Sequence, residues 1–161
     1  MLSRTAENLY WISRYMERAE TTARLIDVGY RMSLFPNPNG HNNEWESVLA
    51  AAGAITGYKE KYNSITQNNV EDYLFFDEGN PSSIYNCILN ARKNALIVRT
   101  SFTPESWLAI NKEYQEILKL KDLEQSLLST KKSAIFEAVI LPSYAHLKAR
   151  NDDKDLSKIL H

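Results

Sequence analysis

The sequence has few of the residues that most functional sites require. Among its 161 residues there are one cysteine, three histidines and five glycines. A single cysteine excludes an internal disulfide and a zinc site built from several cysteines. The histidines form no Glu-x-x-His or His-Glu-x-x-His motif, and the glycines stand singly rather than in a phosphate-binding loop. We therefore expect no metal and no cofactor, and we expect Cys87 to be a buried, unreactive thiol.

The chain also lacks an excess of charge and a long apolar run. Nineteen basic residues against twenty acidic residues give a net charge of −1, which offers little support for nucleic-acid binding or for a polybasic membrane anchor. The longest apolar runs, such as residues 138–141, are far shorter than the ~20 residues of a membrane span. No apolar stretch of signal-peptide type opens the chain. We therefore expect a cytoplasmic protein with neither a membrane nor a nucleic-acid partner.

Apolar residues recur at helical spacing along most of the chain. The first series alternates steps of three and four residues and predicts a helix over residues 3–33: Leu9, Ile12, Met16, Ala19, Ala23, Ile26 and Tyr30. Similar patterns and capping residues predict further helices. We place them after Asn43 and ending near Gly57, over 70–76, from Pro104, and over 122–141. Another is expected to end near Val98 and to begin at either Asn80-Pro81 or Ser82-Ser83. The sequence thus predicts an all-α antiparallel helical bundle of about five to six helices. We expect one domain over residues 1–145 and a charged tail over 146–161.

The first predicted helix carries charged residues away from its apolar seam. Arg14 and Arg18 share the side of Trp11, which lies roughly opposite the seam, and Glu17 and Glu20 flank that side. Glu17 is three residues from Arg14, and Glu20 is four residues before Arg24, so both pairs are within reach of each other. Leu25 and Gly29 also fall near Trp11, which predicts that this helix contacts other helices on two sides.

Arg92 falls within the apolar sector of the predicted helix that ends near Val98, and Arg99 follows one heptad later. A core-facing arginine requires a carboxylate or several carbonyl groups, and Glu17 or Glu20 are the candidate partners. The alternative is that the Arg92 guanidinium reaches water along the helix. The predicted polar network, or candidate site, consists of Arg14, Glu17, Arg18, Glu20, Arg92 and Arg99.

Several segments of the sequence, including the start of the first predicted helix, resemble a known family. Residues 3–20, SRTAENLYWISRYMERAE, closely resemble the opening of the alpha-E family, a bacterial helical domain named for its Glu-Arg motif. The segments 80–84 and 91–95 and the pair Trp107 and Asn111 are similar to further stretches of that family, although Lys93 stands where the family usually has Glu. Family members are usually longer and carry a second Glu-Arg helix. A chain of this length is therefore expected to complete its fold as a homo-oligomer, most simply a twofold dimer.

The resemblance implies a role beside circularly permuted ATP-grasp ligases and transglutaminase-like peptidases, in a peptide-synthesis or peptide-modification system. Because no catalytic constellation is evident, the first hypothesis is a non-catalytic adaptor that binds such a ligase. A second is an enzyme in which Glu17 or Glu20 acts as general base and arginines bind a carboxylate or phosphate group. A third is a structural remnant that is retained as a binding module. The sequence assigns no residue to a catalytic step.

Overall fold

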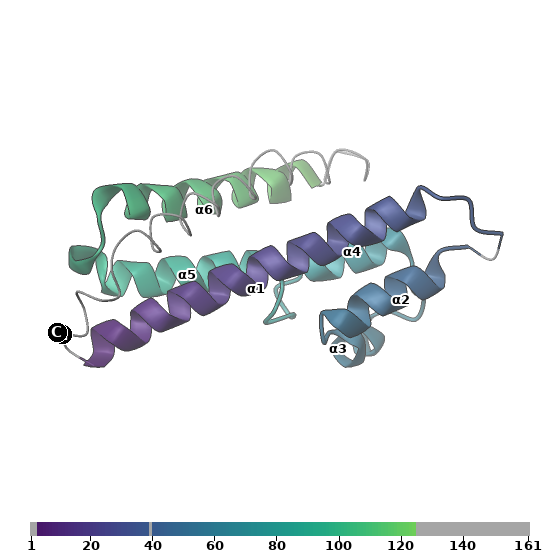
Figure 1. Cartoon of the computed structure of the whole chain (residues 1–161), viewed down its shortest axis with the longest axis horizontal. Coiled ribbons are helices and arrows are strands. Elements are labelled where there is room, and N and C mark those ends of the chain that lie inside the picture. Colours follow the sequence, from purple (N-terminus) through teal and green to yellow (C-terminus); the bar gives the residue numbers. More distant parts are fainter. Residues whose placement is uncertain (1–2, 39, 125–161) are drawn as a thin grey trace.

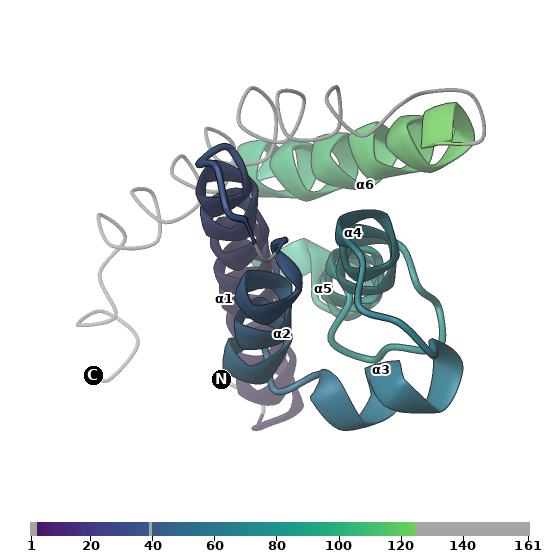
Figure 2. The ribbon, with the colours of Figure 1, turned by 90° about the vertical axis from the view of Figure 1, so that its right-hand side faces the viewer.

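A computed structural model describes residues 3–38 and 40–124, and these residues form helices and no strand. The helices are α1 (Ser3–Ser33), α2 (Asn42–Ala51), α3 (Ile55–Lys61), α4 (Gln67–Phe75), α5 (Ile84–Ile97), the 3-10 turn η1 (Arg99–Ser101) and α6 (Pro104–Glu124). The all-α prediction is confirmed. The long helix α1 runs beside α4 and α5, and α6 lies on the opposite side of the bundle from α2 and α3 (Figure 1). In the end-on view of Figure 2, α1 stands on one side and α4 and α5 on the other. Within the described ranges no helix is long and apolar enough to cross a membrane.

The principal contact of the fold is between α1 and α5, which run antiparallel (Figure 1). The predicted apolar seam of α1 is largely buried, and α5 presents Ala91 and Ala95 with no exposed surface. Ala19 and Ala23 are equally buried on α1. Because short side chains allow helix axes to approach closely, these alanines favour close packing between α1 and α5.

Two clusters of buried apolar side chains surround this contact. One joins the C-terminal half of α1 to α2, α3, α4 and the start of α5, with Trp45 and Tyr58 as its largest fully buried members. The other joins Ile12 and Met16 of α1 to the end of α5 and to Ile110 of α6. Helix α6 contributes to both clusters, since its Ile117 packs in the first. The long helices therefore tie the two clusters into one bundle.

The predicted helix boundaries are mostly confirmed by capping contacts. Thr66 precedes α4 and accepts a hydrogen bond from the Asn69 amide at 3.3 Å, and Ser83 precedes α5 and accepts one from the Asn86 amide at 3.2 Å. Before α6, the Thr103 hydroxyl accepts from the Ser106 amide at 3.3 Å. These side chains satisfy amides that the first helical turn leaves without a partner. The α4 helix begins three residues earlier than predicted because Thr66, rather than a residue next to Val70, is its cap.

Two further predicted boundaries are wrong. The helix expected to end near Gly57 ends at Ala51, because Gly53 adopts a positive φ of 65° that terminates an α-helix, and Gly57 lies inside α3. A separate helix was expected to begin at Asp122, but α6 continues through that residue to Glu124. The rest of that predicted helix and the predicted charged tail lie outside the described residues.

Gly29 shows where α1 contacts a second partner. A Cβ atom at this position would lie 2.8 Å from Cζ3 of Trp45 and 3.0 Å from Cγ2 of Val48, both on α2. The glycine therefore permits α2 to pack directly on the α1 backbone. Near the other end of α1, Trp11 is 42% exposed. The prediction of contacts on two sides is thus correct for the C-terminal half of α1 and wrong for Trp11.

Replacing Gly29 with alanine should destabilise the protein by about 1–2 kcal/mol, because the buried Trp45 ring must move to admit the methyl group. Urea unfolding monitored by circular dichroism measures this change. Thr21→Ala, on the exposed face of the same helix, is the control and should stay within about 0.5 kcal/mol of the parent. A Gly29→Ala variant as stable as the parent would contradict the close contact.

Candidate functional site

The Glu-Arg pair at positions 17 and 18 lies on the exposed surface of α1. Nη1 of Arg14 donates to Oε2 of Glu17 at 2.8 Å, and both side chains are about half exposed, at 51% and 53%. The predicted pairing of these two residues is confirmed. An exposed ion pair contributes less than about 1 kcal/mol to folding. The Arg14–Glu17 pair therefore does little to stabilise the bundle.

The neighbouring pair on α1 is also confirmed. Nε and Nη2 of Arg24 both donate to Oε1 of Glu20, at 3.0 and 2.6 Å. Glu20 is the more protected partner, with 16% of its side chain exposed against 63% for Arg24. Each glutamate that was a candidate partner for Arg92 is therefore held by an arginine of its own helix.

Arg18 is exposed and forms no hydrogen bond or ion pair with the part of the chain that the structure describes. The positive charge of Arg18 also acts on the pKa of Cys87, whose thiol is fully buried on α5. Burial raises the pKa of Cys87 to about 11, and the positive charge of Arg18 only partly opposes this rise. The prediction of a buried thiol is confirmed, and at neutral pH the thiol carries its proton.

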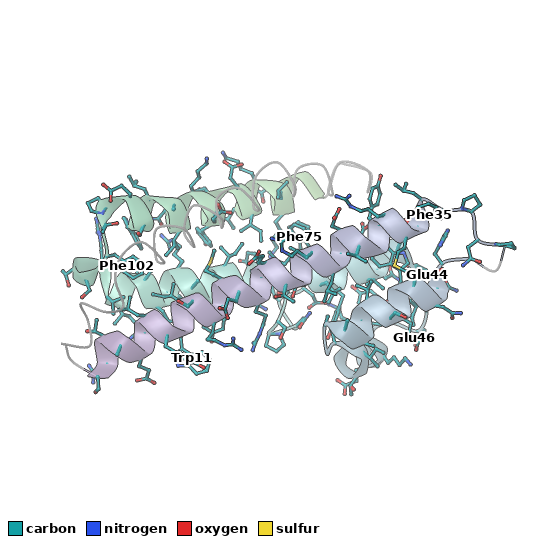
Figure 3. All side chains as sticks on the ribbon, viewed as in Figure 1. Trp11, Phe35, Glu44, Glu46, Phe75 and Phe102 are labelled. Atoms are coloured by element: carbon teal, nitrogen blue, oxygen red, sulfur yellow. The ribbon has the colours of Figure 1, made fainter. Side chains whose placement is uncertain are left out.

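Three aromatic side chains lie close together on α1, within about two turns before Glu17-Arg18. The ring of Trp11 is 5.4 Å from that of Tyr10 and 5.9 Å from that of Tyr15, measured between centroids. Tyr10 is 58% exposed, and Figure 3 shows Trp11 projecting from the side of α1 that faces away from α6. Trp11 and Arg18 are seven residues apart and so lie on one side of the helix. We call the exposed set Trp11, Arg14, Glu17 and Arg18 the motif face.

The two predicted arginines of α5 and η1 contact α6 instead of α1. Nε of Arg92 donates to Oδ1 of Asn111 at 2.9 Å, and its guanidinium carbon lies 4.6 Å from the ring centroid of Tyr114. The guanidinium of Arg99 lies 5.3 Å from the ring of Trp107. The expectation that Glu17 or Glu20 pairs with Arg92 is therefore wrong. An amide oxygen and an aromatic face satisfy a half-buried guanidinium without a carboxylate.

The six residues of the predicted network thus divide into two groups. Arg14, Glu17, Arg18 and Glu20 lie along α1, whereas Arg92 and Arg99 join the end of the α5 region to α6. The structure does not bring them together as one site. Within the described residues, no group of three or more His, Cys, Asp and Glu side chains could hold a metal ion.

Three carboxylate side chains are buried that the sequence analysis did not predict to be buried. Glu113 of α6 is 1% exposed, Glu71 of α4 is 5% exposed, and Asp77 in the turn after α4 is 8% exposed. Glu113 stands three residues after Ile110 and four before Ile117, both of which are buried. That spacing places it on the apolar seam of α6 and was the available signal. Asp77 had no such signal, because it lies outside a regular helix.

Comparison with known proteins gives one result. The model of the Alpha-E family, described as a predicted alpha-helical domain with a conserved ER motif, matches residues 1–147. The chain belongs to the Alpha-E family. No curated protein and no solved structure matches it. Glu17-Arg18 is the one Glu-Arg dipeptide of this Alpha-E sequence, and both side chains lie on the exposed surface of α1.

Replacing Arg92 with lysine should destabilise the protein by about 1–2 kcal/mol, because an ammonium group keeps the charge but loses the planar contacts with Asn111 and Tyr114. Arg24→Lys is the matched control, since Arg24 forms an exposed ion pair, and it should change stability by less than about 0.5 kcal/mol. Urea unfolding gives both values. Equal effects of the two substitutions would show that Arg92 does not join α5 to α6.

Proposed function

We propose that this chain is a non-catalytic adaptor that binds an ATP-grasp-type ligase through the motif face of α1. The observation that carries the proposal is the exposure of Glu17-Arg18 on the helix that also exposes Trp11, about two turns away. The resemblance to the alpha-E family supplies the class of partner, a ligase of a peptide-synthesis or peptide-modification system in which transglutaminase-like peptidases also take part.

The residue types of the motif face suit an interface. Tryptophan and arginine supply much of the binding energy at protein interfaces, since both combine a large contact area with directed hydrogen bonds. The Arg18 guanidinium offers donors in the fork geometry that fits a carboxylate. The Arg14–Glu17 pair lies one helical turn away and adds a charge of each sign. We therefore expect Arg18 to pair with a carboxylate of the ligase and Trp11 to pack beside it.

The hypothesis that the chain is an enzyme has less support than the adaptor hypothesis. A general base in a protected site is the core of that hypothesis, but Glu17 is half exposed and bound by Arg14, and Glu20 is bound by Arg24. The two arginines that contact α6 are engaged by Asn111 and by aromatic rings. The adaptor is accordingly the function that we propose.

Reversing the charge of Arg18 tests the proposal. The untagged chain is co-expressed with a tagged ATP-grasp ligase encoded beside it, and the affinity of the purified pair is measured by calorimetry. Arg18→Glu should weaken binding at least about thirtyfold, because it removes a central charge pair and adds a repulsive one. The control is Lys93→Glu, a charge reversal at an exposed position of α5, which should change affinity less than about threefold.

Two outcomes contradict the proposal. One is a ligase that does not bind the parent chain at micromolar concentration, or that binds both variants equally well. The other is found by sedimentation of the chain alone: if it self-associates and Arg18→Glu abolishes this self-association, the motif face binds a second copy instead of a ligase.

A further inference from the structure

A hollow of about 680 Å³ lies on a part of the molecule that the motif face does not include. Its walls come from α3, the end of α4, the turn that follows α4, and Lys121 near the end of α6. Its lining residues are Gly57, Glu60, Lys61, Tyr62, Asp72, Tyr73, Phe76, Asp77, Glu78, Gly79 and Lys121. The volume is within the range of small-molecule sites.

The lining of this hollow is strongly charged and aromatic. Four carboxylates face two lysines, which leaves an excess of two negative charges at neutral pH. Tyr62 and Tyr73 stand edge to face, with ring centroids 6.1 Å apart and planes at 84°. Carboxylates combined with ring faces are the surroundings that an organic ammonium group prefers. Since no three carboxylates in the described ranges converge as metal ligands, the lining favours an organic cation over a metal ion.

The two lysines of the hollow show how it holds an ammonium group. Nζ of Lys61 donates to Oδ2 of Asp77 and lies 5.7 Å from the ring centroid of Tyr62. Nζ of Lys121 donates to Oε1 of Glu78 and lies 4.2 Å from the ring of Tyr85. In each case one primary ammonium is bound by a carboxylate and an aromatic ring together. A ligand ammonium has to displace one of these lysines to reach Asp77 or Glu78. Glu60 forms no hydrogen bond or ion pair with the described residues and can bind such a group directly.

Electrostatic effects on the lining agree with this geometry. The hydrogen bond to Asp77 raises the pKa of Lys61, against a smaller lowering by burial. Burial raises the pKa of Tyr73, and the negative charges of Asp77 and Glu60 raise it further. The contributions of Asp77 and Glu60 favour positive charge in this part of the hollow, whereas burial by itself disfavours charge of either sign.

Gly57 leaves space for the side chain of Tyr73 at the hollow. A Cβ atom at this position would lie 2.5 Å from the hydroxyl oxygen of Tyr73. Only a residue without a side chain lets that hydroxyl sit against α3. The position of the Tyr73 hydroxyl thus depends on a glycine in the middle of a helix, where glycine costs roughly 0.5–1 kcal/mol relative to alanine.

We propose that the hollow binds a flexible ligand that carries primary ammonium groups, of the type found in linear diamines and lysine-like side chains. Glu60, Asp77 and Glu78 supply the carboxylates, and Tyr62 and Tyr73 supply the ring faces. This site does not depend on the motif face, and each can be present without the other.

Calorimetric titration of the full chain with cadaverine, a linear five-carbon diamine, tests the proposal. We expect saturable binding that weakens as salt is added, because the attraction is mainly between opposite charges. Glutarate, the dicarboxylate of similar length, should not bind. The double substitution Glu60→Gln and Glu78→Gln should weaken cadaverine binding at least about tenfold, and Glu60→Gln alone about threefold.

Glu46→Gln provides the matched control, because Glu46 pairs with Lys59 and does not line the hollow; it should change the affinity less than about twofold. The proposal is overturned if no saturable heat appears up to roughly 10 mM cadaverine, if glutarate binds as tightly, or if Glu46→Gln weakens binding as much as Glu60→Gln. Circular dichroism checks the fold of each variant. Should the double variant unfold, the exposed Glu60→Gln substitution decides the question alone.

Discussion

The packing of α1 against α5 is the largest helix–helix contact of the described residues, and the other helices are arranged around it. Ala19 and Ala23 of α1 are buried in the cluster that contains Ile84 and Ile88 of α5. Ala91 and Ala95 of α5 are buried in the cluster that contains Ile12 and Met16 of α1. Around this contact the larger residues divide into two apolar clusters, and α6 packs against both. A bulky or charged residue at any of these alanines would have to displace a neighbouring helix, because protein interiors are close-packed.

This constraint decides where the charged residues lie. The inner side of α1 is filled by small and apolar groups, which leaves its outer side for Arg14, Glu17 and Arg18. The side of α5 that does not contact α1 contacts α6 instead, and there Arg92 finds an amide and an aromatic ring. Arg92 and Arg18, which the sequence suggested as parts of one polar network, thus have different positions: Arg92 joins α5 to α6, whereas Arg18 lies on the exposed side of α1.

The positions of the helices could be predicted from the sequence more accurately than the contacts between them. Periodicity and capping residues located α1, α4, α5 and the start of α6, because those signals are local to each helix. The break at Gly53 was missed because two glycines four residues apart offer equal C-cap signals, and only the backbone conformation separates them. The partner of Arg92 was wrong because a helical wheel gives a direction but does not identify the helix that lies there. The hollow was not predicted at all, since its lining comes from four separate segments.

Position 17 of α1 faces solvent, whereas the adjoining α1–α5 contact is closed. Thiol labelling of a Glu17→Cys variant measures both properties in one experiment, because Cys87 is the only native cysteine and lies buried on α5 with a pKa raised to about 11. At neutral pH the introduced thiol should react nearly as fast as in the urea-unfolded chain, and Cys87 at least about 100-fold more slowly. Rapid labelling of Cys87 in the folded chain, or a protected thiol at position 17, would contradict the account.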